Sequence, residues 1–385
     1  MNRRAYRRRD SFGGMSRRDF LSLMTAAAAS AGVIAVSAGC APLLGGAAGT
    51  KIGGKLNLCV WQGYDDPKAA KPFTDKYQVV TTGTYMSANE ECLVKETAAP
   101  GSFDNIALNM TYCPSFQKAG LILPVDLNVV KSWPDIIEGL RSQPYITIDG
   151  KPWLVPYIWG TTCVVYNPKK VTVPTGFEFK DLAFDDKLKG RITVLDDPAG
   201  SMIMISLMNG FKNPTLITKD QLKQNVDLGK QLKSRLLSIT SSVSDTSDAM
   251  VRGDSWVHLD GWEQITKAVI DGGGSAASAY PAHSWSWCDG WMVTSHSNNV
   301  ATAWAYVNQM TSPEAMAIIG DDQFYAPSNK KAFPLLGQAA AAMFSITNLE
   351  PALAQSPVLP LPPDKSDQYS TFSDWQQAWS EIKGA

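Results

Sequence analysis

Residues 153–167 read Trp-Leu-Val-Pro-Tyr-Ile-Trp-Gly-Thr-Thr-Cys-Val-Val-Tyr-Asn, two apolar runs that meet at Gly160. Val, Ile, Tyr, Trp and Thr are typical of β-strands, and a glycine between two such runs lets the backbone turn or be approached closely. This combination fits a segment that crosses between two lobes. It also fits a single buried strand with a bulge, so the stretch alone leaves both alternatives open.

Predicted strands and helices alternate on both sides of this stretch. We expect strands at 56–61, 79–84, 106–110, 191–195, 256–259 and 290–294, and helices at 89–98, 198–208, 222–236, 299–310, 314–319 and 372–382, the last after a proline-rich linker at 356–364. Helix starts are indicated by Ser87-Ala88-Asn89-Glu90 and by Asp197-Pro198. Strands that alternate with helices predict parallel pairing with crossover helices, so the expected class is α/β.

The first 39 residues are typical of a targeting segment and not of a fold. They hold seven Arg and no Lys, and from Phe20 to Ala38 they form an uncharged run rich in Ala, Ser and Val. Ser16-Arg17-Arg18-Asp19-Phe20-Leu21 resembles the twin-arginine export signal, which predicts export across the cytoplasmic membrane. The apolar run is too short and too rich in small residues for a permanent membrane span.

Ser37-Ala38-Gly39-Cys40 follows directly and resembles the lipobox at which bacterial lipoproteins are cleaved and lipidated on cysteine. We therefore expect a lipid anchor on Cys40 and a periplasmic or outer-face location, with a soluble exported protein cut near the same place as the alternative. Residues 40–54 are small, glycine-rich and nearly uncharged, which suits a flexible tether. The folded body should start at Lys55.

The composition after the targeting segment is mildly acidic. Removing residues 1–39 removes seven Arg and two Asp, which leaves 28 basic and 34 acidic side chains and a formal charge of −6. This charge argues against a nucleic-acid partner and is compatible with a cationic ligand. The remaining 346 residues suit two domains better than one core. All twelve Trp follow residue 60, and such side chains either fill cores or line a cleft.

Five cysteines remain if Cys40 carries lipid, so they cannot all pair and at most two disulfides can form. They are Cys59, Cys92, Cys113, Cys163 and Cys288. Most of them lie in apolar runs, where a buried thiol packs as a small hydrophobic side chain. The sequence therefore implies no particular disulfide.

Motifs for catalysis and metal binding are missing. Only His258, His283 and His296 exist, and none has another His, Cys or carboxylate at the spacing of a metal-ligand pair on a helix. The patterns Gly-x-Ser-x-Gly, His-Glu-x-x-His and Gly-x-Gly-x-x-Gly are absent. We therefore expect no metal, no cofactor and no enzyme. A Ser/His/Asp triad brought together by the fold would leave a secreted hydrolase as the alternative.

Seven short segments carry, by their order and spacing, a resemblance to a known family. They are Cys59–Tyr64, Phe103–Ile106, Lys118–Ile122, Val155–Thr161, Leu195–Asp197, Gly261-Trp262 and Trp285–Asp289. Over nearly all of its mature part the chain resembles the extracellular solute-binding proteins of ABC importers, specifically the spermidine/putrescine receptors. The resemblance implies a small-molecule ligand and a membrane permease as partners of a monomer.

The same resemblance implies the fold. It is a two-lobed periplasmic-binding-protein fold of type II-like topology, in which each lobe is a mixed sheet flanked by helices and crossing strands join the lobes. We expect lobe 1 to comprise 55–159 and 289–335, and lobe 2 to comprise 160–288 and 336–385. The lobes should close on the ligand like a hinged clamp.

A polyamine is a methylene chain with ammonium groups, so its receptor needs aromatic faces and carboxylates. By resemblance, the candidate ligand-binding residues are Trp61, Tyr64, Asn109, Thr111, Asp197, Trp262, Trp287, Asp289 and one of Phe324 and Tyr325. In the family that the chain resembles, acids at the positions of Asp197 and Asp289 hold the ammonium groups of the ligand. Core packing remains the alternative for each Trp, and a helix N-cap remains the alternative for Asp197.

The chain departs from the family pattern at two positions. Where the family has a second acid that holds an ammonium group, this chain has Gly200. Where the family has a tyrosine, this chain has Thr111. A missing carboxylate partner should cost about 2 to 5 kcal/mol of binding unless Asp260, Glu263 or another acid replaces it. Another small organic solute, such as thiamine, an amino acid derivative or a sugar, is therefore the alternative ligand.

Overall fold

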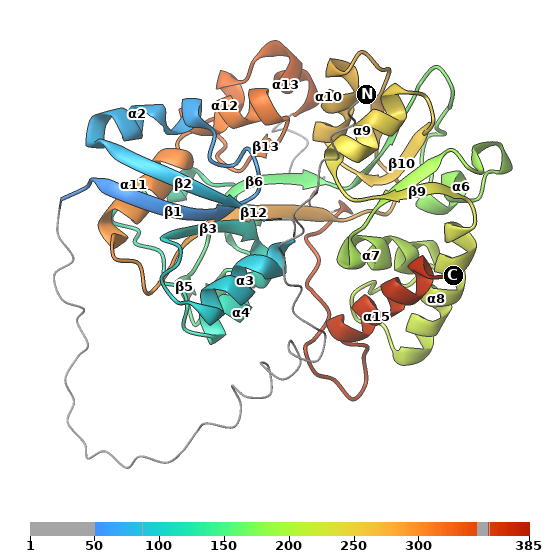
Figure 1. The fold of residues 1–385 in the computed structure, drawn as a ribbon, viewed down its shortest axis with the longest axis horizontal. Helices are drawn as coiled ribbons and strands as arrows, with labels where there is room; N and C mark the ends of the chain where they lie inside the picture. Colours follow the sequence, from blue (N-terminus) through green and yellow to red (C-terminus); the bar gives the residue numbers. More distant parts are fainter. Residues whose placement is uncertain (1–50, 87, 345–352, 354) are drawn as a thin grey trace, which may run out of the picture. The chain divides into compact units, whose positions relative to one another are not determined.

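The computed structural model describes residues 51–86, 88–344, 353 and 355–385 (Figure 1). The twin-arginine segment, Cys40 and most of the predicted tether lie outside the described residues. Two sheets organise the described chain, one of six strands and one of five. Among the described helices, none combines the length and the apolar character needed to cross a bilayer.

The first sheet is mixed and brings distant segments side by side, as the blue and orange strands of Figure 1 show. Its order is β13 (Ala326–Pro327), β6 (Val155–Thr161), β12 (Ser286–Val293), β3 (Asn105–Asn109), β1 (Gly54–Val60) and β2 (Val79–Tyr85). Strand β1 is parallel to β2 and β3, whereas β12 is antiparallel to β3 and β6. The helices that follow its strands or pack beside them are α2 (Pro67–Tyr77), α3 (Asn89–Ala98), α11 (Val300–Met310), α12 (Pro313–Gln323) and α13 (Gln338–Met343).

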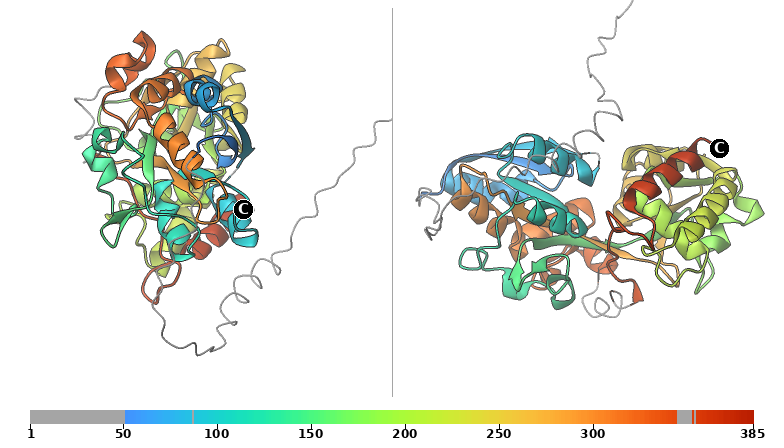
Figure 2. Two further views of the ribbon diagram at one scale, coloured as in Figure 1. Left: turned by 90° about the vertical axis from the view of Figure 1, so that its left-hand side faces the viewer. Right: turned by 90° about the horizontal axis from the view of Figure 1, so that it is seen from below.

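The second sheet is also mixed. Its order is β11 (Ala277–Ala279), β7 (Cys163–Tyr166), β10 (Val257–Gly261), β8 (Ile192–Leu195) and β9 (Leu236–Thr240). Its helices are α6 (Phe179–Ala183), α7 (Pro198–Met208), α8 (Lys219–Lys233), α9 (Val243–Val251), α10 (Glu263–Asp271) and α15 (Phe372–Lys383). Figure 2 shows the red α15 beside α8, although more than a hundred residues separate them. Trp375 and Trp379 of α15 are buried in this core.

The remaining elements are short. They are α4 (Cys113–Lys118), α5 (Glu138–Arg141), the hairpin β4 (Thr147–Ile148) and β5 (Lys151–Pro152), and the 3-10 turns η1 (Met110–Tyr112), η2 (Trp133–Asp135), η3 (Asp186–Leu188) and η4 (Phe333–Leu335).

Where the described chain passes between the two sheets, hydrogen bonds join segments that are distant in the sequence. The Thr162 N–H donates to the carbonyl of Trp285 at 2.9 Å, and the Ser286 N–H donates to the carbonyl of Pro357 at 3.0 Å. The predicted junction at Gly160 is therefore two residues too early, since Gly160 lies inside β6 and the break falls at Thr162. Gly160 forms no turn; its missing side chain lets the Trp287 indole approach the strand closely.

Local capping explains where several helices begin. Asp197 accepts hydrogen bonds from the backbone at the start of α7, and Pro198 occupies its first position, where no donor is needed. Thr218 and Gln221 form a capping box, which starts α8 at Lys219, three residues before the predicted start. Helix α3 has the predicted bounds, but its N-cap is Ala88 and no side chain caps it.

A disulfide joins Cys59 of β1 to Cys92 of α3. The sequence did not imply it, because the pairing depends on how α3 returns over β1. The other three cysteines of the described chain, Cys113, Cys163 and Cys288, are free and buried.

Candidate functional site

Four aromatic side chains form a continuous cluster that draws on elements of both sheets. The Tyr325 ring lies 5.9 Å from Tyr64 and 5.7 Å from Trp287, and Trp287 lies 6.5 Å from Trp262. All three contacts are edge-on, the arrangement that aromatic quadrupoles favour. Trp262 directly precedes α10, beside the second sheet. Trp287 lies in β12 of the first sheet, Tyr64 follows β1 and Tyr325 directly precedes β13. We call these four residues the aromatic cluster.

Gly160 makes room for the Trp287 indole. The two residues are paired across β6 and β12. A Cβ atom on Gly160 would lie 2.6 Å from Cζ2 and 2.9 Å from Cε2 of the indole, closer than van der Waals contact allows. Any side chain at position 160 would therefore displace the ring from the strand.

Gln264 holds the cluster together by hydrogen bonds. Its Oε1 accepts from the Tyr325 hydroxyl at 2.8 Å and from the Trp262 indole N–H at 3.3 Å. Its amide group donates to Gln323 Oε1 at 3.2 Å. Sequence reasoning did not find Gln264, since a polar residue in the first turn of a helix is ordinary; its place two residues after Trp262 was the only signal.

Asp289 is a buried carboxylate next to this cluster. It is 4% exposed, and its Oδ2 accepts from the Tyr64 hydroxyl at 2.6 Å. Asn109, its partner across β3 and β12, donates a side-chain hydrogen bond to it. Burial raises the pKa of Asp289 to about 7, although both hydrogen bonds favour the ionised form. Within the described residues Asp289 forms no ion pair, so its charge has no cationic partner.

Asp197 caps α7. Its two carboxylate oxygens accept from the backbone N–H groups of Ala199 and Gly200, both at 3.0 Å. Burial raises the pKa of Asp197 above its usual value, these two hydrogen bonds oppose that shift, and the nearby Glu90 carboxylate adds to it. Asp197 is therefore the N-cap of α7, the alternative that the sequence left open. Each of its carboxylate oxygens still has a lone pair that can accept from another donor.

The model of the bacterial extracellular solute-binding protein family matches residues 47–344. The chain belongs to this family. The putrescine-binding periplasmic protein SpuD of Pseudomonas aeruginosa is 23% identical over 352 residues, 85% of this chain and 91% of that protein. The putrescine-binding periplasmic protein PotF of Escherichia coli is 22% identical over 85% of this chain and 91% of its own length.

Solved structures show the same fold. A putative spermidine/putrescine ABC transporter protein from Listeria monocytogenes superimposes with a TM-score of 0.75 at 18% identity, covering 86% of this chain and 98% of that chain. The predicted family and the predicted two-lobed α/β fold are confirmed. The solute-binding family also bears out the prediction of a receptor over that of a secreted hydrolase.

Contacts of three further predicted residues of this solute-binding protein can be given. Thr111 donates its hydroxyl to Asn109 Oδ1 at 2.7 Å. Trp61 is partly buried, and its carbonyl accepts from the Tyr64 N–H at 3.1 Å. Phe324 is not part of the aromatic cluster, since its ring packs 6.4 Å from Phe344.

Asp260 and Glu263, the possible replacements for the acid that is missing at position 200, both accept hydrogen bonds from residues in or near the second sheet. Asp260 accepts from the Leu195 N–H at 2.9 Å, and burial raises its pKa to about 7. Glu263 accepts from the Tyr280 hydroxyl at 2.5 Å, and burial raises its pKa as well. Neither contacts the aromatic cluster by a hydrogen bond of the described residues.

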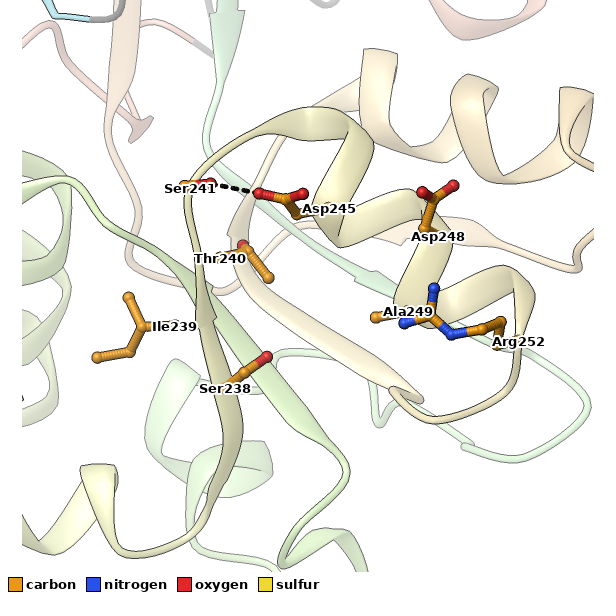
Figure 3. A pocket seen from close by; sticks show the side chains of 8 residues that line it. All are labelled: Ser238, Ile239, Thr240, Ser241, Asp245, Asp248, Ala249 and Arg252. Atoms are coloured by element: carbon orange, nitrogen blue, oxygen red, sulfur yellow. Dashed lines mark hydrogen bonds between the residues drawn. The ribbon is translucent and has the colours of Figure 1, made fainter. Parts of the chain in front are cut away.

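A separate surface pocket of about 310 Å³ lies between β9 and α9 (Figure 3). It is lined by Ser238, Ile239, Thr240, Ser241, Asp245, Asp248, Ala249 and Arg252. It contains no aromatic side chain and shares no residue with the aromatic cluster. In the described part of the chain, no group of three or more His, Cys, Asp or Glu side chains is arranged to hold a metal ion.

Proposed function

We propose that this solute-binding protein captures a small cationic amine, a polyamine such as putrescine or spermidine, and delivers it to a membrane permease of an ABC importer. The observation that carries the proposal is the buried Asp289 carboxylate, which lies beside aromatic rings and forms no ion pair with any residue that the structure describes. Several relatives are named as putrescine-binding or spermidine/putrescine-binding proteins, which supports the same ligand class.

The chemistry of the site matches that of an aliphatic diamine. A buried carboxylate is costly unless it is paired, and an ammonium group supplies both the opposite charge and hydrogen-bond donors. The faces of Trp262 and Trp287 suit the methylene chain and attract the cation. Tyr64 and Asn109 orient the carboxylate, so the ligand meets a preformed acceptor.

We propose that the protein acts as a monomer that closes about the crossing segments. Because β6 reaches Thr161 and β12 begins at Ser286, these strand ends belong with the first sheet, and the lobe boundaries lie near Thr162 and Trp285. Ligand contacts from both sheets would then drive a hinge motion. Trp262 from one lobe and Trp287 from the other, whose rings lie 6.5 Å apart, would both contact the ligand.

We also propose export by the twin-arginine route and lipidation of Cys40. The tether predicted to run to residue 54 is too long, because Gly54 already pairs with Val79 in the first sheet and the Gly53 N–H donates to the Thr302 hydroxyl. The Cys59–Cys92 disulfide is compatible with an oxidising compartment outside the cytoplasm. Mass spectrometry of the exported protein tests the anchor: a mature chain that starts at a diacylglyceryl-modified Cys40 is expected. An unmodified N-terminus elsewhere would refute lipidation.

A thermal-shift panel of polyamines, amino acids, sugars and thiamine tests the ligand class on the mature chain. Polyamines should raise the melting temperature, since a ligand at a hundredfold excess over Kd stabilises by about 2.7 kcal/mol. Asp289→Asn should abolish the response. Asp248→Asn removes an exposed carboxylate of α9 and is the matched control. No response to any amine, or equal responses of the two variants, would reject the proposal.

A further inference from the structure

Helix α10, beside the second sheet, contacts three consecutive residues that belong to the lobe of the first sheet. The Gln264 side chain donates to Gln323 Oε1 at 3.2 Å and accepts from the Tyr325 hydroxyl at 2.8 Å. Between those two residues, the centroid of the Phe324 ring lies 5.4 Å from the Lys267 ammonium group, within the range of a cation–π attraction. The three residues end α12 and lead into β13. We call these three contacts the interlobe clasp.

The backbone of the first lobe is shaped to present its half of the clasp. Phe324 is the C-cap of α12 and has φ 55° and ψ 51°, a left-handed conformation that is unfavourable for a residue with a side chain. On the other side of Gln323, Gly63 has φ 93°, and a Cβ atom there would lie 2.9 Å from Gln323 Oε1. The missing side chain at position 63 therefore lets the Gln323 amide lie against the loop that follows β1. Backbone strain of this kind persists where the surrounding contacts maintain it, and it is common at functional sites.

The side-chain oxygen of Gln264 is fully used within the protein. It accepts from the Tyr325 hydroxyl and, at 3.3 Å, from the Trp262 indole N–H, so both lone pairs of this carbonyl oxygen have a donor. A ligand ammonium group would need one of them. The same atom thereby fixes Trp262 in its own lobe and Tyr325 in the other, and these two rings lie 6.5 Å and 5.7 Å from Trp287.

We propose that Gln264 is a positioning residue that holds the two lobes together through the interlobe clasp and thereby sets how slowly a bound ligand leaves. This inference rests on the hinge closure of the proposed function and not on the identity of the ligand. The clasp forms only when the lobes are close, and it consists of protein groups alone. It therefore favours the closed state with and without ligand, and a closed state that is already populated costs a ligand less free energy to reach.

Stopped-flow measurement of putrescine binding, followed by tryptophan fluorescence, tests the proposal on the mature chain. Because the clasp closes after the ligand has entered, Gln264→Ala should raise the dissociation rate at least about fivefold and change the association rate less than about twofold. Gln323→Ala removes the partner on the other lobe and should act in the same way. Gln376→Ala removes an exposed glutamine of α15 and is the matched control, which should change neither rate.

The double variant tests the contact between the lobes directly. Gln264→Ala and Gln323→Ala remove the same hydrogen bond, so their combined effect on the dissociation rate should be smaller than the product of the two single effects. Effects that multiply fully would overturn the clasp, as would an unchanged dissociation rate or a loss confined to association. Both side chains are half-buried, and each single variant should keep a melting temperature close to that of the wild type.

X-ray scattering without ligand makes the test independent of the ligand class. Gln264→Ala should move the unliganded protein toward the open state and give a larger radius of gyration than the wild type and Gln376→Ala. Identical radii would overturn the proposal. If the wild type bound no amine while Gln264→Ala still gave the larger radius, the proposed ligand would be rejected and the clasp supported, which separates the two failures.

Discussion

Amine binding should depend on pH through Asp289. The pKa of this carboxyl is raised to about 7 because it is buried in β12, and an ammonium ligand needs it ionised. Aliphatic amines titrate near pH 10, as the lysine side chain does, so the ligand stays charged throughout the neutral range. Affinity should therefore rise as the pH increases through 7 and then level off.

The magnitude follows from the fraction of the free protein that is ionised at Asp289. At pH 7 about half is ionised, and each pH unit below 7 lowers that fraction about tenfold, so binding at pH 5 should be about a hundredfold weaker than the plateau. Below pH 7, ligand binding must also release close to one proton from the Asp289 carboxyl. Asp289→Asn should lose this dependence together with most of the affinity.

Calorimetry of putrescine binding between pH 5 and 8.5, in two buffers of different ionisation enthalpy, measures the affinity and the released proton together. Equal affinities at pH 5 and pH 8, or the same slope in wild type and Asp289→Asn, would refute the assignment of the cation to this carboxylate. A weaker slope that persists in the variant is expected from Asp197, whose pKa is also raised.

Three further predictions concern the packing, the disulfide and the helix cap. Gly160→Ala should displace the Trp287 indole and lower amine affinity measured by calorimetry, at a cost of about 1 to 3 kcal/mol in unfolding free energy for overpacking. Replacing Cys59 and Cys92 together by Ser should lower the free energy of unfolding in urea by about 3 to 4 kcal/mol, given their separation of 33 residues, and should remove any effect of reductant. Asp197→Asn should keep the melting temperature close to the wild type, because Asn caps helices as well as Asp does, yet weaken putrescine binding; a large loss of stability would contradict this.

Local signals predicted much of the fold. Helix α7 runs from Pro198 to Met208 as expected, since an Asp-Pro start and an Asn-Gly end mark it in the sequence. The edge strand β9 was missed, and its first residue was assigned to the preceding helix. Its side chains are mostly exposed or half-exposed, so it lacks the apolar pattern by which buried strands are predicted.

Some residues of the candidate site could likewise be predicted from the sequence and others could not. Asp289, Trp287 and Tyr64 could be named from the sequence because a family resemblance marked their positions, and the structure brings them together. Gln264 could not, because a polar side chain is common in the first turn of any helix. Only the pairing of distant strands shows which of these ordinary residues face a common centre.

Asp197 and Asp289 are not equivalent as partners for a cation. Both oxygens of Asp197 already accept backbone N–H groups of α7, and the partial positive charge at that helix start offsets some of its negative charge. Asp289 accepts only from neutral side chains and is almost fully buried, so its charge is less compensated. A single ammonium group should therefore prefer Asp289.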